Sequence, residues 1–194
     1  MIRLGNFSVV LDACVLYDSI IRDFLLCIAE KELYRPVWSL EICKEVERNL
    51  SKKIGTQKAE KLVKVINQAF PEAITLNEIS CLELKGININ TKDIHVLTTA
   101  ICSEAQVILT YNVKDFPSED LSKFSIEALT PDVFLINLLD LSFFKVLNTF
   151  KELEQHYKNP PIPRETLFKW YQARVPSFMN TVIPYLDGSI TKIY

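Results

Sequence analysis

Two short apolar runs, each followed at once by polar side chains, constrain the fold of this chain most. Residues 7–11 and 106–110 are rich in β-branched and aliphatic side chains, and their lengths suit buried strands. Asp12 follows the first run directly, and the polar segment 112–115 follows the second. Helical patterns lie between the two runs, so the order of elements predicts an α/β domain with a parallel sheet.

Helical spacing and N-cap residues predict the other elements. Ser39 is placed to cap a helix that buries Ile42, Val46 and Leu50, and Thr91 to cap a helix over residues 92–105. Further helices are expected at residues 20–31, 57–70, from Pro131 onward and last at 164–173, and further strands at 33–37 and 74–76. We expect residues 1–130 to form the α/β domain and residues 131–194 a helical extension packed on that domain.

Composition excludes several classes of protein. The net charge of -2 argues against a broad grip on duplex DNA, which needs many cations. Only four glycines are present, so glycine-rich phosphate loops are nearly excluded. The stretch 48–64 is nevertheless basic, and it is either a solvated helix face or a patch that contacts phosphate.

The five cysteines point to a reducing compartment. Their number is odd, none are spaced as Cys-x-x-Cys, and only two histidines are present, so neither a disulfide framework nor a zinc site is indicated. The N-terminus lacks a secretory signal pattern, and no run of 18 apolar residues appears. We therefore expect a cytoplasmic protein with reduced, mostly buried cysteines and no membrane association.

Carboxylates recur where the predicted sheet would gather functional groups. Asp12 ends the first strand, Glu45 lies on the helix after Ser39, Asp93 lies in the first turn of its helix, and Asp115 follows the second strand. Each alone is more often a cap, a turn residue or a solvated acid. Together they can converge at one edge of a parallel sheet, where functional groups gather beyond the carboxyl ends of the strands.

Such a cluster favours a divalent cation. Carboxylates packed together repel, and a cation relieves that repulsion. All the predicted ligands are oxygen atoms, which favours Mg²⁺ or Mn²⁺ over zinc. A site of this kind suits the hydrolysis of a phosphodiester, because the metal polarises phosphoryl oxygens and lowers the pKa of an attacking water.

Four segments resemble the motifs of the PIN-domain family. They are VVLDACVL at residues 9–16, WSLEICKEV at 38–46, TKDIHVLTTA at 91–100 and VILTYNVKDFP at 107–117. The last has the form found in one PIN subgroup. The motifs are short, but they occur in the family's order at fitting spacings, and the resemblance covers residues 7 to about 135.

The resemblance implies a three-layer fold with a parallel sheet, here with extra C-terminal helices. It implies a metal-dependent endoribonuclease with Asp12, Glu45, Asp93 and Asp115 as catalytic metal ligands. Many members are toxins that cut RNA and are blocked by a small antitoxin protein.

Some positions near these ligands leave alternatives open. The resemblance implies Thr110 and Asn112 as polar support for the metal. Many PIN domains carry Asp at the position of Asn112, so Asp115 would bind metal directly or through water. Glu41, one helical turn earlier, is a less favoured alternative to Glu45. His95 invites the role of general base, but because it lies two residues past Asp93 we expect its side chain to point elsewhere on the helix.

Other functions fit the pattern less well. A haloacid-dehalogenase-type phosphatase needs a second Asp two residues after the first, where this chain has Cys14. A receiver domain needs an acidic pair before its phosphorylated Asp and a Lys after a late strand, and neither is in place. A PIN fold that binds RNA or protein without cutting remains the main alternative, because Asn112 departs from the common pattern.

The segment 133–150 is apolar on most sides. A helix of this kind must be buried on most sides. We expect the last helix, through Leu167, Trp170 and Tyr171, to cover part of it, and a homodimer or a partner helix to cover the rest.

Overall fold

The chain folds into two compact units. The computed structural model describes residues 7–76, 84, 86–157 and 161–190. The first unit consists of residues 1–18 and 34–130, and the second of residues 19–33 and 131–194. Residues 19–33 therefore group with the C-terminal helices, although they precede most of the first unit in the sequence.

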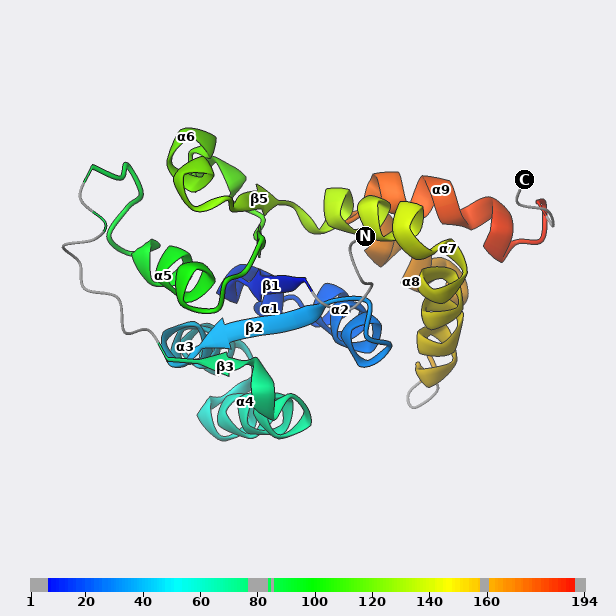
Figure 1. Ribbon diagram of the computed structural model, residues 1–194. Helices are drawn as coiled ribbons and strands as arrows, with labels where there is room; N and C mark the ends of the chain where they lie inside the picture. Colours follow the sequence, from blue (N-terminus) through cyan, green and yellow to red (C-terminus); the bar gives the residue numbers. More distant parts are fainter. Residues whose placement is uncertain (1–6, 77–83, 85, 158–160, 191–194) are drawn as a thin grey trace. The chain divides into compact units, whose positions relative to one another are not determined.

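A parallel five-stranded sheet forms the centre of the first unit (Figure 1). In chain order its strands are β1 (Ser8–Leu11), β2 (Arg35–Ser39), β3 (Ile74–Thr75), β4 (Val107–Leu109) and β5 (Glu127–Leu129). They are arranged as β3-β2-β1-β4-β5, so β1 is the central strand. Val10 pairs with Val37 on one side and with Ile108 on the other. All of β1 is buried, as the apolar run predicted.

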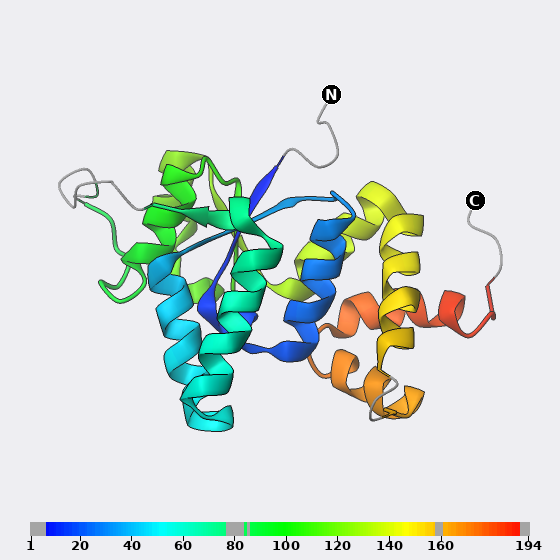
Figure 2. The ribbon, with the colours of Figure 1, turned by 90° about the horizontal axis from the view of Figure 1, so that it is seen from below.

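Helices cover this sheet from both faces. They are α1 (Ala13–Tyr17), α3 (Leu40–Ile54), α4 (Thr56–Ala69), α5 (Ile94–Cys102) and α6 (Ser118–Leu121), with 3-10 turns η1 (Pro71–Ala73), η2 (Val113–Asp115) and η3 (Ser122–Phe124). Along the chain, β2 and β3 are added on one side of β1, and β4 and β5 are then added on its other side. Right-handed crossovers therefore place α3 and α4 on one face and α5 on the other. Figure 2 shows α3 and α4 packed side by side. The predicted three-layer α/β fold is confirmed.

The start of α3 follows the expected capping rule. The Ser39 hydroxyl accepts a hydrogen bond from the backbone N–H of Ile42 at 3.3 Å, which satisfies one of the free donors of the first turn. The predicted core positions Ile42, Val46 and Leu50 are buried. The helix ends before Gly55, whose φ of 86° favours glycine.

The start of α5 differs from the sequence-based expectation. The predicted cap at Thr91 is wrong, because α5 begins at Ile94 and Asp93 occupies the N-cap position. The side chain of Asn90 accepts a hydrogen bond from the N–H of Lys92 at 3.1 Å, and the carbonyl of Asn90 accepts one from Asp93. Asn90 thus stabilises a turn through the residues that were expected to be the first helical turn.

Among the described residues, the second unit contains four helices. They are α2 (Ser19–Glu30), α7 (Pro131–His156), α8 (Arg164–Gln172) and α9 (Pro176–Leu186). Their core is aromatic: the rings of Phe24 and Phe150 meet at 5.3 Å, and the hydroxyl of buried Tyr171 donates to the carbonyl of Ile20. The expectation that the helix at residues 164–173 is the last one is wrong, because α9 follows it. Two backbone N–H groups at the start of α9 donate to the carboxylate of Asp132.

The helix α7 is long, and much of it is apolar. It contains a non-helical residue, Ser142, and it leaves Val133, Leu141 and Phe144 exposed, by 47%, 42% and 65%. In the part of the chain that the structure describes, α7 alone is long and apolar enough to span a membrane by length and composition. Core helices of soluble proteins meet the same criterion.

The cysteines that the structure describes are free thiols. Cys14, Cys27, Cys43 and Cys102 form no disulfide. Cys81 lies outside the described residues.

Candidate active site

Asp12 lies at the carboxyl end of the central strand. Its backbone N–H donates to the carbonyl of Leu109, which continues the pairing of β1 with β4 beyond the strands. The side chain is buried. One oxygen, Oδ2, accepts hydrogen bonds from the Thr110 hydroxyl at 2.6 Å and from the Cys14 thiol at 3.1 Å. Two neighbours therefore fix the orientation of this carboxylate.

Cys14 supports Asp12 and is a poor nucleophile. Burial and the adjacent charge of Asp12 raise the pKa of the Cys14 thiol to about 12. A thiol with this pKa stays protonated near neutral pH and donates its proton toward Asp12 instead of attacking a substrate.

Thr110 connects Asp12 to the loop that carries Asp115. While its hydroxyl donates to Asp12, its oxygen accepts the backbone N–H of Asn112 at 3.0 Å. The carbonyl of Asn112 then accepts the N–H of Asp115 at 2.9 Å. Thr110 is fully buried, whereas Asn112 is exposed. The backbone of Asn112 thus holds the loop.

Asp93 faces two of the other acids. Burial raises the pKa of its carboxyl, and the negative charges of Asp115 and Asp12 raise it further. The ammonium of Lys92, 3.8 Å from Oδ2, lowers this pKa, as does His95. Within the described residues, Oδ2 is buried and has no hydrogen-bond partner. The structure therefore brings Asp12, Asp93 and Asp115 close enough for their charges to interact.

Glu45 meets His95 across the gap between α3 and α5. The Nε2 atom of His95 lies 3.6 Å from Oε2 of Glu45, and both side chains are partly buried. The side chain of His95 was expected to point elsewhere on its helix, but it contacts Glu45, another of the predicted site residues. The one-dimensional spacing of His95 and Asp93 could not show that α3 supplies a partner. The rival acid Glu41 is exposed.

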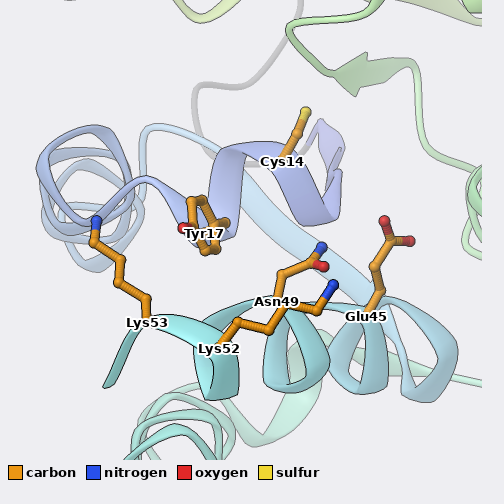
Figure 3. A pocket seen from close by; sticks show the side chains of 6 residues that line it. All are labelled: Cys14, Tyr17, Glu45, Asn49, Lys52 and Lys53. Carbon is orange, nitrogen blue, oxygen red and sulfur yellow. The ribbon is translucent and has the colours of Figure 1, made fainter. Parts of the chain in front are cut away.

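A hollow of about 510 Å³ opens beside Glu45. It is lined by Cys14 and Tyr17 of α1 and by Glu45, Asn49, Lys52 and Lys53 of α3, and we call it the α1–α3 hollow. Figure 3 shows the side chains of Glu45 and Asn49 rising from α3 toward α1, whereas the side chain of Lys52 extends along α3. The sequence contained only one signal for this hollow, the basic stretch that includes Lys52 and Lys53.

The acids do not form a complete set of metal ligands. Among residues 7–76, 84, 86–157 and 161–190, no three His, Cys, Asp or Glu side chains are grouped as a metal site. The residues nevertheless fit a divalent cation. The buried Oδ2 of Asp93 lacks a hydrogen-bond donor, and neighbouring carboxylates disfavour its charge. A cation bound by oxygen ligands relieves both conditions.

Sequence comparison assigns the domain that carries this site. A family model described as PIN domain matches residues 8–114, which include every strand of the sheet except β5. The chain belongs to the PIN domain family.

Two proteins illustrate what this chain is similar to. It is 35% identical over 95 residues to the "Putative ribonuclease VapC50" of Mycobacterium tuberculosis (strain ATCC 25618 / H37Rv), which is 49% of this chain and 56% of that protein. The chain thus spans little more than half the length of that curated relative. A chain in a structure of VapBC-1 from nontypeable Haemophilus influenzae is 17% identical, with a TM-score of 0.47, and the match covers 64% of this chain and 98% of that one.

Proposed function

We propose that this protein is a divalent-metal-dependent endoribonuclease whose catalytic residues are Asp12, Glu45, Asp93 and Asp115. One observation carries the proposal: the partly buried carboxylate of Asp93, whose Oδ2 atom is buried, is close enough to Asp12 and Asp115 for their charges to raise its pKa. Carboxyl groups whose pKa is raised by burial and by neighbouring negative charges gather at functional sites. The 35% identity of half the chain to a protein named as a ribonuclease supports the choice of RNA.

The proposed ligands would hold Mg²⁺ or Mn²⁺ through their carboxylate oxygens. When bound, such a cation polarises the phosphoryl group and lowers the pKa of an attacking water. Asp12 contributes an oxygen whose direction is fixed by Thr110 and Cys14. Asp93 contributes the oxygen that lacks a hydrogen-bond donor within the described residues.

The other proposed site residues act on charge and position. His95, 3.6 Å from Glu45, is placed to orient that carboxylate and, when protonated, to balance its charge. Thr110 and the backbone of Asn112 hold the loop from which Asp115 reaches the site. The exposure of the Asn112 side chain supports Asp115, and not Asn112, as the ligand from this loop.

Cleavage of RNA by the purified protein tests this function. We expect cutting that requires Mg²⁺ or Mn²⁺ and stops in EDTA, and we expect Asp12→Asn and Asp93→Asn to abolish it. Glu45→Gln should lose most of the activity, whereas Glu41→Gln, a matched change one helical turn earlier at an exposed position, should keep it. Equal activity of wild type and Asp12→Asn would refute the proposal.

A non-catalytic PIN module is the second candidate. It is favoured by the Asn at position 112 and by the lack of a grouped set of three metal-binding side chains among the described residues. Such a module would bind RNA or protein without cutting. RNA binding without metal-stimulated cleavage, by a protein that also fails to bind Mn²⁺, would favour this candidate.

We also propose that the chain is the toxin of a toxin–antitoxin pair. The family resemblance of the four motifs supports an antitoxin partner, and the exposed apolar side chains Val133, Leu141 and Phe144 of α7 are available for contact with a second copy or a partner helix. Induced expression should arrest growth for wild type and not for Asp12→Asn. Sedimentation of the purified chain tests the homodimer, and a stable monomer would remove that part of the proposal.

A further inference from the structure

The α1–α3 hollow begins at the proposed active site and continues away from it along α3. Glu45, Asn49 and Lys52 are spaced by four and three residues, so they share one face of the helix. Lys52 lies seven residues beyond Glu45, which corresponds to about 10 Å along the axis. The lining thus changes from an acid beside the proposed metal ligands to cations at the far end.

The polar groups at the far end of the hollow are mostly unpaired among the described residues. Within the described residues, neither Lys52 nor Lys53 has a carboxylate within ion-pair distance, and the Asn49 amide makes no hydrogen bond. Both lysines are exposed and Asn49 is partly exposed. These donors are therefore available to a ligand.

Tyr17 adds an aromatic wall to this basic end. Its partly exposed ring lines the hollow, and the ammonium of Lys53 lies 5.5 Å from the ring centroid. A cation at this distance is attracted by the ring and helps to hold it in place. Lysines in the last turn of a helix also interact favourably with the helix dipole. The interaction with the helix dipole explains the two lysines at this end of α3. It does not explain why Tyr17 and Asn49 line the same hollow.

We propose that the α1–α3 hollow is a subsite for single-stranded RNA. Lys52 and Asn49 bind a backbone phosphate near the one that is cut, Lys53 adds positive charge, and Tyr17 packs against the neighbouring base. A strand with about 3.4 Å between stacked nucleotides covers the distance from Glu45 to Lys52 in about three nucleotides. The proposal rests on the proposed function in taking RNA as the substrate, and it names where the strand lies.

The structure also separates two groups of lysines within the basic stretch 48–64. Lys52 and Lys53 line the hollow, whereas Lys58 and Lys61 are exposed on α4 and do not line it. All four are exposed helical residues, so replacement by Ala should leave the fold intact. The double variant Lys58→Ala/Lys61→Ala is therefore a control with the same change of charge as Lys52→Ala/Lys53→Ala.

Binding of a short fluorescent single-stranded RNA, measured across a salt titration, tests the subsite. The measurements use the full chain with Asp12→Asn in EDTA, so that binding does not depend on cleavage. Removing one cation that neutralises a phosphate should reduce the slope of log affinity against log salt by about 0.7. We expect a reduction of about 0.7–1.4 for Lys52→Ala/Lys53→Ala and none for the Lys58/Lys61 control.

Tyr17 supplies an independent measurement. Tyr17→Phe should retain affinity, whereas Tyr17→Leu, which keeps apolar bulk without the ring, should weaken binding by about five-fold or more. A thermal melt of each variant checks that the fold persists. A Tyr17→Leu protein that is folded and binds as wild type contradicts the stacking role.

Several outcomes would overturn the subsite. They are unchanged binding by Lys52→Ala/Lys53→Ala, an equal loss in the Lys58/Lys61 control, or equal affinity for duplex DNA. If the wild type cuts RNA while Lys52→Ala/Lys53→Ala binds normally, the nuclease proposal stands and the subsite fails. If RNA binds through the hollow and the wild type never cuts, the subsite stands and the nuclease proposal fails.

Discussion

Asp93→Asn should make the metal-free protein slightly more stable while it abolishes activity. In the folded protein, burial and the charges of Asp115 and Asp12 raise the pKa of Asp93, so its ionised form is disfavoured near neutral pH. Asn is neutral, has a similar shape and is as good an N-cap residue as Asp. The substitution removes the repulsion and keeps the position of Asp93 before α5.

The expected gain is small because opposing effects nearly balance. A buried polar oxygen without a partner costs about 1–3 kcal/mol, and partial exposure of Asp93 reduces that penalty. The substitution also removes an exposed pair with Lys92 worth less than about 1 kcal/mol, together with a favourable dipole interaction of similar size. We therefore expect a gain of about 0.5 kcal/mol, or about 1–2 °C in the melting midpoint.

The pH dependence has a definite sign. A carboxyl whose folded pKa is raised destabilises the fold as pH rises through that pKa. The advantage of Asp93→Asn should therefore be present near pH 7 and disappear below the ordinary Asp range, near pH 4. Calorimetry in EDTA at both pH values measures it, and amide exchange of α5 reports the same change locally.

With bound metal, the wild type should become more stable than Asp93→Asn. A cation present at 100 times its dissociation constant stabilises the wild type by about 2.7 kcal/mol, whereas Asp93→Asn should gain much less. Glu60→Gln, an exposed change on α4, serves as the control and should stay within about 0.5 kcal/mol of wild type. A loss above about 1 kcal/mol for Asp93→Asn in EDTA would refute the reasoning and make Asp93 a structural cap.

Three further predictions concern individual hydrogen bonds and one thiol. Thr110→Val removes the 2.6 Å bond to Asp12 and should lower RNA cleavage about 10–100-fold, whereas Thr110→Ser should restore most of it in the same assay. Cys14, with a pKa of about 12, should be alkylated at pH 8 far more slowly than free cysteine, as followed by mass spectrometry. Labelling at the rate of free cysteine would contradict the raised pKa of this thiol. Asp132→Ala removes two hydrogen bonds to the start of α9 and should lower the free energy of unfolding by about 1 kcal/mol. Asp140→Ala, at an exposed position of the same helix, should change this free energy little, and denaturant titration compares the two variants.

Local patterns in the sequence predicted the elements that local physics controls. The buried run before Asp12 became β1, and Ser39 capped α3 through its own hydroxyl. Strand composition and capping depend on residues a few positions apart, so a short window of sequence contains them. The start of α5 was missed because Asn90 competes with Thr91 for the same turn, and both residue types favour caps and turns.

The sequence also named the acids, but only the tertiary structure decided how they meet. Thr110 and Cys14 fix Asp12 because β1 and β4 are neighbours in the sheet, although Thr110 is 98 residues away from Asp12. His95 was expected to point elsewhere on its helix, yet it meets Glu45 because α5 and α3 approach each other from separate crossovers.

Local elements could be predicted from the sequence and long-range contacts could not, for a physical reason. This sequence by itself determined an α/β chain with carboxylates at the ends of its strands, because hydrophobic periodicity and turn residues act over a few positions. Strand order, crossover handedness and packing bring distant residues into contact, and these depend on the free energy of the whole fold. Tertiary structure alone therefore decided that Glu45, Asn49 and Lys52 share a hollow with Tyr17.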